Sequence, residues 1–311
     1  MVMTTSGVNG AARSPRRNFP AHQILTLFGD YWWGVPEAIP TGALLAGLGD
    51  LGVNEPAARA AISRLVDQDL LEMSKEGRRT SHALSERGQR VVRDEARWLT
   101  RFGCSDVEWD GLWSVIAFTI PEAQRSQRHV ARTRLRWLGY APLYDGVWIS
   151  PFDTREQAEQ VLGEAGVPDV TSSRSALRMS DPAGPARAWN MEEVRQSYLE
   201  FIARANDLAR ELEPLPAFAA RTGLMLAWQT FRQNDPDHPS EILPVDWPRR
   251  AARLAFARAY NTLGGPAEQR MHMHVAKISR ELAEYVTVQR LSIECPPSTG
   301  IEDGGSTSRN N

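Results

Sequence analysis

Apolar residues recur at helical spacing in three short segments near the N-terminus. Ile24, Leu27 and Tyr31 are three or four residues apart, so they fall on one face of a first helix. A second helix is expected to begin at Thr41, whose hydroxyl suits a helix cap. A third follows Asn54, a residue type strongly preferred as a cap, and carries proline in its first turn. The pattern therefore predicts three short helices in succession.

Two short extended segments, residues 71–74 and 81–84, follow the third helix. Gly77 supplies the turn between them, and the surrounding residues at the tip are basic. Three short helices followed by a basic hairpin is the element order of a winged helix-turn-helix. In such a domain one helix enters the major groove, which is about 12 Å wide, while the hairpin reaches the backbone or the minor groove. We therefore assign residues 20–90 to a winged helix that binds DNA.

Six residues of this domain are candidates for DNA contact. Those on the outer face of the third helix would meet base edges, and those on the hairpin would hold the backbone or minor groove. They are Arg59, Ser63 and Arg64 on the helix, and Lys75, Arg78 and Arg79 on the hairpin. The alternative interpretation is that they form the solvated faces of a helix and a hairpin. The order of the elements favours DNA contact.

The rest of the chain divides by its periodicity. Residues 91–108 are predicted as a linker helix, and residues 109–180 show strands and helices in the order of a small ferredoxin-like domain. Residues 190–290 are helical, whereas residues 1–19 and 291–311 have the composition of a disordered arm and tail. The predicted fold class is α+β and multidomain: a winged helix-turn-helix, a ferredoxin-like domain and a helical C-terminal domain.

The composition indicates in which cellular compartment the chain is expected. The 311 residues include no run of eighteen apolar positions, so no membrane span is expected, and the polar N-terminus does not resemble a secretory signal. The two cysteines, Cys104 and Cys295, lack metal-ligand spacing, which favours a reducing cytoplasm. A net charge of −2 does not by itself indicate a nucleic-acid binder. DNA responds to the local field, however, and residues 54–90 carry seven Lys and Arg side chains.

The sequence shows no catalytic constellation. It has neither a Gly-x-Ser-x-Gly elbow nor a phosphate-binding loop of the Walker type, and Cys104 has no obvious histidine partner. His272 and His274 are two residues apart, a spacing that suits a strand better than the helix expected there. We expect them to form a surface pair and not a zinc site. The chain is therefore predicted to be a non-enzyme without a metal or cofactor.

Short strings in a fixed order along the chain carry a resemblance to a known family. They lie at residues 24–31, 51–55, 61–66, 76–79, 109–113, 135–140, 146–151 and 242–248. In these strings the chain resembles the PaaX family of bacterial regulators, named for repression of phenylacetate catabolism. The resemblance extends over residues 22–275. It implies a three-domain dimeric repressor whose middle domain is similar to the small CRISPR adaptation nuclease. Such repressors are displaced from DNA by an intermediate of aromatic catabolism, best known as phenylacetyl-CoA.

Three departures qualify what the resemblance implies. The nuclease needs an acidic residue at the end of its first strand to hold a metal, whereas here that strand ends at Ile120 and Asp110 precedes it. We therefore expect no nuclease activity. The family's usual tyrosine in a helix before the Leu-Pro segment is Phe231 here, which leaves the identity of the inducer open. The chain after Val275 is also longer than the family pattern.

Two sets of residues fit an inducer such as an aryl-acyl-CoA, which needs cations for its phosphates and an apolar slot for its acyl group. Tryptophan and phenylalanine at helical spacing more often form core than pocket, so both sets stay open. The first set, in the C-terminal domain, is Arg221, Trp228, Phe231, Arg232 and Trp247. The second, on a middle-domain helix, is Arg132, Arg134, Arg136 and Trp137.

The sequence thus predicts a cytoplasmic homodimer that binds double-stranded operator DNA and represses a catabolic operon until a small-molecule inducer releases it. One alternative is an architectural DNA-binding protein that needs no effector. The other is a metal-dependent nuclease.

Overall fold

The computed structural model of the 311-residue chain places its residues in two compact units, each built from separate stretches of sequence. The structure describes residues 19–104, 108–178, 188–209, 213–235 and 237–294. Unit 1 comprises Met1–Arg97, Arg210–Leu226 and Asn261–Arg290. Unit 2 comprises Trp98–Ala209, Ala227–Tyr260 and Leu291–Asn311. Of the arm expected at residues 1–19 and the tail expected at residues 291–311, all but Phe19 and residues 291–294 lie outside the described residues.

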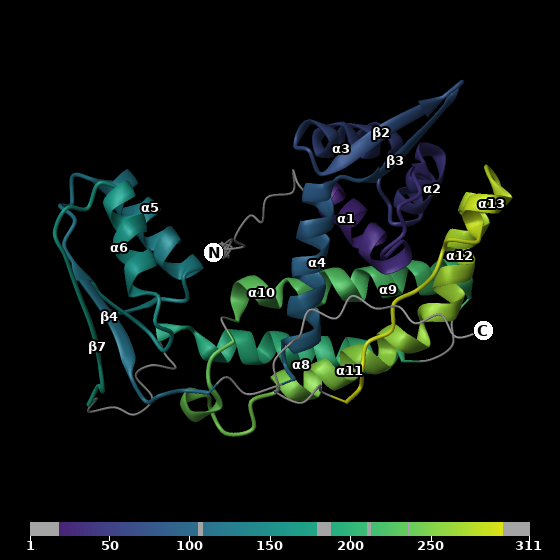
Figure 1. The fold of residues 1–311 in the computed structure, drawn as a ribbon. Helices are drawn as coiled ribbons and strands as arrows, with labels where there is room; N and C mark the ends of the chain where they lie inside the picture. The colour runs from purple at the N-terminus through teal and green to yellow at the C-terminus, as the bar shows by residue number, and fades with distance from the viewer. Residues whose placement is uncertain (1–18, 105–107, 179–187, 210–212, 236, 295–311) are drawn as a thin grey trace, which may run out of the picture. The chain divides into compact units, whose positions relative to one another are not determined.

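Unit 1 contains the three helices and the hairpin that the sequence predicts (Figure 1). The helices are α1 (Phe19–Tyr31), α2 (Thr41–Asp50) and α3 (Glu55–Asp67). The antiparallel sheet has the order β1-β3-β2 and consists of β1 (Ile39–Pro40), β2 (Leu71–Glu76) and β3 (Arg79–Leu84). The two-residue strand β1 is too short to produce an alternating pattern, so it was not predicted.

The two predicted helix caps have different outcomes. The side chain of Asn54 accepts a hydrogen bond of 2.9 Å from the backbone N–H of Ala57, so this cap is confirmed. Thr41 does not cap α2, because it is the first residue of the helix and Pro40 holds the cap position. The Thr41 hydroxyl instead donates to the carbonyl of Thr80 at 2.8 Å, which ties α2 to the hairpin.

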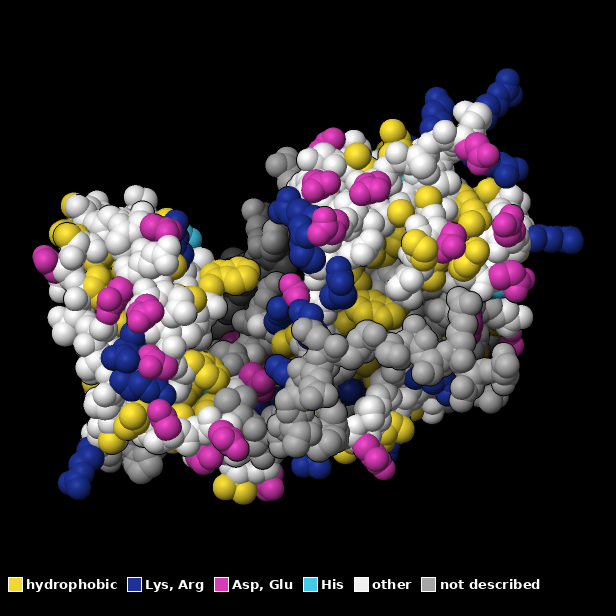
Figure 2. All heavy atoms as spheres, in the orientation of Figure 1, with side chains coloured by type: hydrophobic (Ala, Val, Ile, Leu, Met, Phe, Trp, Pro, Cys, Tyr) yellow, Lys and Arg dark blue, Asp and Glu magenta, His cyan; other side chains and the backbone are white. Residues whose placement is uncertain are grey.

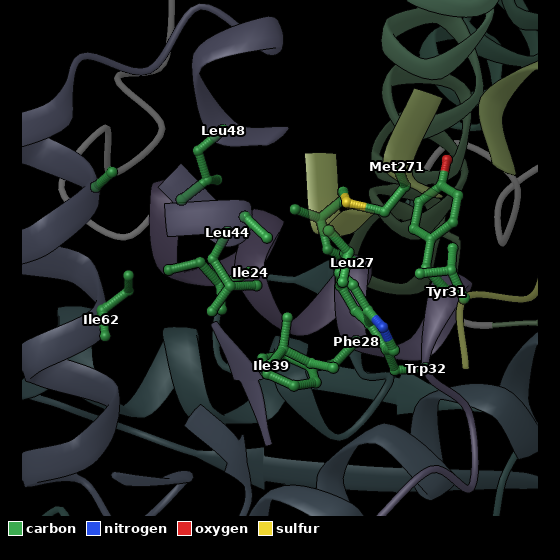
Figure 3. Packing of buried hydrophobic residues seen from close by; sticks show 14 of the residues in the cluster. Ile24, Leu27, Phe28, Tyr31, Trp32, Ile39, Leu44, Leu48, Ile62 and Met271 are labelled. Atoms are coloured by element: carbon green, nitrogen blue, oxygen red, sulfur yellow. The ribbon is translucent and has the colours of Figure 1, made fainter. Parts of the chain in front are cut away.

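The hydrophobic core of unit 1 includes residues from far along the chain. Figure 3 shows Met271 pointing into the cluster beside Leu27 and Tyr31 of α1. Phe218 also belongs to this cluster and is fully buried. The contributing elements are α9 (Pro214–Gln229), α12 (Gly264–Ala276) and α13 (Arg280–Ala283). The winged helix therefore shares one core with helices that follow it by more than a hundred residues.

Helix α12 packs closely against α2. A Cβ atom at Gly47 would lie 2.7 Å from the Cε of Met271, so the missing side chain permits the close approach. Asp50 accepts hydrogen bonds of 2.7 and 2.8 Å from Arg270, and its carboxylate lies 2.6 Å from Nε2 of His274. Partial burial alone would raise the pKa of Asp50, but the hydrogen bonds from Arg270 and His274 outweigh it and hold this pKa below its usual range.

This arrangement corrects the prediction of a histidine pair on the surface. His274 is buried and bonded to Asp50, whereas His272 is half-buried. The helical character predicted for residues 190–290 is interrupted here, because α12 ends at Ala276 and α13 begins at Arg280. Among the described residues, no group of three or more His, Cys, Asp and Glu side chains is arranged to hold a metal ion.

Unit 2 contains the ferredoxin-like domain (Figure 1). Its sheet is antiparallel with the order β5-β6-β4-β7, and Ile116, Leu135 and Leu162 belong to the core between the sheet and its two helices. This confirms the predicted order of strands and helices in the ferredoxin-like domain. The elements are β4 (Trp113–Phe118), α5 (Arg125–Trp137), β5 (Ala141–Tyr144), β6 (Val147–Ser150), α6 (Arg155–Glu164) and β7 (Val170–Ser175).

The remaining helices of unit 2 enclose an aromatic core. The Trp228 and Phe256 rings stack with centroids 4.9 Å apart, and those of Tyr198 and Phe231 stack at 4.1 Å. The helices α4 and α9 contribute residues to both units. The elements are α4 (Glu86–Arg101), α8 (Met191–Leu208), α10 (Phe231–Asn234), the short 3₁₀ helix Ser240–Ile242 and α11 (Arg249–Thr262).

A buried ion pair lies beside this aromatic core. Asp235 accepts hydrogen bonds of 2.9 and 2.7 Å from the Arg249 guanidinium and one of 2.7 Å from the Tyr198 hydroxyl. Burial would raise the pKa of Asp235, but the charge of Arg249 outweighs it and keeps this pKa below its usual range.

Of the helices described, none has the length and apolar character needed to cross a bilayer.

Candidate nucleic-acid interface

Helix α3 has one buried face and one face open to solvent. Ala58, Ala61, Ile62 and Leu65 are buried in the core of unit 1, which is what their spacing of three and four residues dictates. The residues between them therefore point outward. Arg59, Ser63 and Arg64, the predicted base-contacting residues, are all exposed.

The hairpin projects beyond the helices. Strands β2 and β3 pair in continuous register from Leu71 opposite Leu84 to Glu76 opposite Arg79. Gly77 has a φ of 58° at the turn, a conformation that favours glycine because it lacks a Cβ. Figure 2 shows Lys and Arg side chains standing out at the tip of this hairpin. The predicted phosphate-contacting residues are all exposed: Lys75, Arg78 and Arg79.

An open groove of about 670 Å³ runs between the start of α2, helix α3 and the hairpin. Four of the six predicted residues line it: Arg59, Ser63, Arg78 and Arg79. Arg64 and Lys75 are not among its lining residues. The groove is lined by cations from α3 and the hairpin, by apolar side chains, and by the carboxylate of Asp67. The cations suit a DNA backbone, and the apolar side chains suit thymine methyl groups.

Sequence reasoning missed two apolar residues of the groove. Met73 is 60% exposed although it lies on a strand, and Ile278 comes from the turn after α12. The sequence of the six-residue strand β2 does not predict that the Met73 side chain is exposed. Ile278 reaches the groove only through a contact between segments that are distant in sequence.

The charge of Arg59 is partly balanced within its own helix. Its Nη2 lies 2.7 Å from Oε1 of Glu55, four residues earlier, and both side chains are largely exposed. An exposed ion pair of this kind contributes about 0.3–0.5 kcal/mol, so a phosphate or a base edge competes with it readily. On the opposite side of the groove, His82 is buried, and its burial lowers its pKa.

The first set of predicted inducer-binding residues is divided between the units. Arg221 belongs to unit 1, where it is fully buried, 3.5 Å from Asp30, with its guanidinium 5.3 Å from the centre of the Tyr31 ring. The other four belong to unit 2. Trp228 and Phe231 are buried in the aromatic core. Trp247 lies 6.0 Å from the ring of Tyr198, and the exposed Arg232 lies over the ring of Trp98.

One residue of the second set, Arg136, lines a pocket of about 420 Å³ in unit 2. Arg136 lines this pocket together with Tyr140, Pro142, Trp189 and Asn190, and its guanidinium lies 5.6 Å from the centre of the Trp148 ring. The other three residues of the set do not line it. Arg132 pairs with Asp145, Arg134 pairs with Glu164, and Trp137 is 75% exposed.

Asp110, considered as a metal ligand, has a different partner. It lies before β4, and its carboxylate accepts hydrogen bonds of 2.8 and 2.9 Å from Arg174 of β7. The backbone N–H of Leu112 and the Arg174 guanidinium hold the pKa of Asp110 below its usual range. This carboxylate therefore ties the segment before β4 to β7.

Family models match three consecutive parts of the chain. The "PaaX-like protein" model matches residues 21–88, the "PaaX protein central Cas2-like domain" model matches residues 106–184, and the "PaaX-like protein C-terminal domain" model matches residues 189–273. The chain belongs to the PaaX family. The PaaX matches cover the winged helix, the ferredoxin-like domain and most of the helices that follow, which confirms the resemblance seen in the sequence strings.

Two further comparisons extend this result. A protein of Escherichia coli (strain K12) named transcriptional repressor PaaX is 29% identical over 262 residues, which is 78% of this chain and 80% of that protein. The solved structure of an uncharacterized protein from Mycobacterium tuberculosis has a TM-score of 0.55 and 21% identity, and the match covers 83% of this chain and 99% of that one. The second comparison shows that this PaaX-family fold occurs in a solved structure.

Proposed function

We propose that this chain is a transcriptional repressor that binds operator DNA through the winged helix of unit 1. The observation that carries the proposal is the groove between α3 and the hairpin, where Arg59 and Ser63 face Arg78 and Arg79. Its relative in Escherichia coli is named as a transcriptional repressor, which supports this function. We further propose that two copies bind a partly palindromic operator, since dimeric helix-turn-helix proteins read two half-sites about one DNA turn apart.

The two sides of the interface are expected to respond differently to mutation. Arg64→Ala should weaken binding by about 1–3 kcal/mol on the preferred operator and less on random DNA, because a base contact is lost. Arg79→Ala should weaken binding equally on all sequences and make its dependence on salt shallower, because a phosphate contact is lost. Fluorescence anisotropy titrations with both duplexes measure these effects. Equal losses for both variants on both duplexes would contradict this division and favour an architectural DNA-binding protein.

We propose that a small-molecule inducer releases the repressor, and that it is an aryl-acyl-CoA of the phenylacetyl-CoA type. Release requires that the inducer binds the DNA-free state more tightly than the DNA-bound state. The pocket at Arg136 and Trp189 supports this proposal, since it combines a cation with aromatic side chains, and the carboxylate of Glu193 also lines it. The buried positions of Trp228 and Phe231 favour this second set of residues over the first.

Phenylacetyl-CoA is expected to dissociate the complex of the repressor with its operator. Arg136→Ala should raise the inducer concentration for half-release by roughly 10- to 150-fold, because one charge-assisted contact is worth about 1.5–3 kcal/mol. Arg132→Ala on the same helix is the control, since Arg132 pairs with Asp145 and does not line the pocket. Anisotropy of labelled operator measures release. No release at saturating phenylacetyl-CoA would show that the inducer is another compound.

A further inference from the structure

Helix α12 runs along α2 toward the candidate DNA-facing groove. At the C-terminal end of α2, Asp50 binds Arg270 of α12. At its N-terminal end, a Cβ atom at Gly42 would lie 3.0 Å from Cδ1 of Ile278. The residue numbers rise along α12 as they fall along α2, so the two segments are antiparallel. The turn after α12 is thereby carried to the start of α2.

This turn, residues 277–280, has a defined conformation. The backbone N–H groups of Ile278 and Ser279 both donate to the carbonyl of Val275 at 2.9 Å. The Ser279 hydroxyl accepts from the N–H of Leu282 at 3.3 Å and caps α13. Val275 and Ala283, on either side of the turn, are fully buried in the core of unit 1. The turn is therefore held in place from both sides.

The turn forms part of the groove wall. Ile278 lines the same groove as Arg59 and Arg78, next to Pro40, Thr41 and Gly42 at the start of α2. In a helix-turn-helix protein the first helix of the motif crosses the DNA backbone while the second enters the major groove. A DNA duplex seated on α3 would therefore pass its backbone near the start of α2, where the turn lies.

The residues that flank Ile278 supply positive charge at this place. Lys277 and Arg280 are both exposed. Glu281 and Glu284 are the acidic side chains of the same segment, and both follow Arg280 along the chain. A phosphate at the start of α2 would meet the two cations, and the two carboxylates would oppose its approach to α13.

We propose that the turn of residues 277–280 is a third DNA-contacting element, in which Lys277 and Arg280 hold backbone phosphates beside the helix and the hairpin. The inference rests on the proposed binding of operator DNA by unit 1. The match to the PaaX-like C-terminal domain ends at residue 273, so the turn lies beyond the matched segment. This contact would enlarge the footprint of the winged helix without adding base specificity, since phosphate contacts position a protein and do not read sequence.

The test is a salt titration of DNA binding by the full chain. The probes are a duplex of about 30 base pairs that the unaltered chain selects from random DNA, and a scrambled duplex of the same length. The variant Lys277→Ala/Arg280→Ala is expected to bind both duplexes roughly 5- to 50-fold more weakly near 0.1 M salt. The slope of log K against log salt should decrease in magnitude by about 1–2, because each phosphate contact contributes about 0.9.

Two control variants separate this contact from a general effect of charge. Arg93→Ala/Arg290→Ala removes the same charge from exposed positions of unit 1 that do not line the groove, and it should leave the slope unchanged. Glu281→Gln should strengthen binding, since it removes an opposing carboxylate. Thermal unfolding of each variant confirms that the fold is intact.

The outcomes distinguish the inference from the proposed function. If the unaltered chain selects no DNA, the proposed function itself fails. If it binds DNA but the Lys277→Ala/Arg280→Ala variant has the same affinity and slope as the control pair, the third contact does not exist and the proposed function stands.

Discussion

Replacing Asp235 with alanine is expected to lower the free energy of unfolding of unit 2 by about 3–5 kcal/mol, the range for breaking a buried ion pair. Arg249 would remain buried without the carboxylate that accepts two of its hydrogen bonds, and would keep the more exposed Asp237 and the carbonyl of His238 as acceptors. The Tyr198 hydroxyl would lose its acceptor as well. The cost comes mainly from the charge left in a medium of low dielectric constant, and only in part from the lost attraction.

Urea unfolding followed by tryptophan fluorescence measures this loss, because Trp189, Trp228 and Trp247 all belong to unit 2. The informative control is the double variant Asp235→Leu/Arg249→Met, which removes both charges and keeps apolar volume. It should be more stable than the single variant by about 2 kcal/mol or more, since replacing a whole buried pair is often neutral. A loss below about 1 kcal/mol in the single variant would show that water reaches the pair.

Acidification is expected to destabilise unit 2 through His238. This side chain is fully buried, and neither ring nitrogen has a hydrogen-bond partner among the described residues. Trp189 meets the His238 ring edge-on with centroids 4.4 Å apart. Burial lowers the pKa of His238 to about 4. The folded protein therefore binds fewer protons than the unfolded chain, whose histidine has a pKa near 6.5.

The sign and the pH range follow from these two pKa values. The stabilisation is complete above about pH 6.5, where neither state is protonated, and it decreases as the pH falls toward 4. The free energy of unfolding should fall by roughly 3 kcal/mol across this range because of His238. Urea unfolding at several pH values measures the slope. His238→Phe keeps an aromatic ring without a titrating group, so its profile should be flatter. Identical slopes for both proteins would contradict the assignment.

The winged helix was predictable because its signals are local. The spacing of Ile24, Leu27 and Tyr31 sets the buried face of α1 without reference to any other part of the chain. The cap at Asn54 involves residues only three positions apart. The contact of Met271 with Gly47, by contrast, depends on how two distant segments pack, and neither residue carries a local sign of it. This is why the sequence assigned α12 to a separate helical domain.

The candidate sites show the same difference. Helical spacing on α3 and the turn at Gly77 were enough to predict one DNA-facing side with Arg59, Ser63, Arg78 and Arg79, and in the structure these four residues line one groove. The inducer site could not be predicted from such local signals. Arg221 and Trp228 are seven residues apart on one helix, a spacing that predicts a shared face, yet they belong to different compact units.

The composite core of unit 1 has a consequence for how the protein is made. Residues 19–97 leave the ribosome early, but Phe218, Met271 and Val286, which complete their core, are synthesised much later. At 5–20 residues per second the delay is roughly 10–40 s. During that interval the nascent winged helix exposes the apolar surface that α12 later covers. A nascent chain therefore completes the core of unit 1 only after Val286 has been synthesised, and a product terminated before that point would lack part of this core.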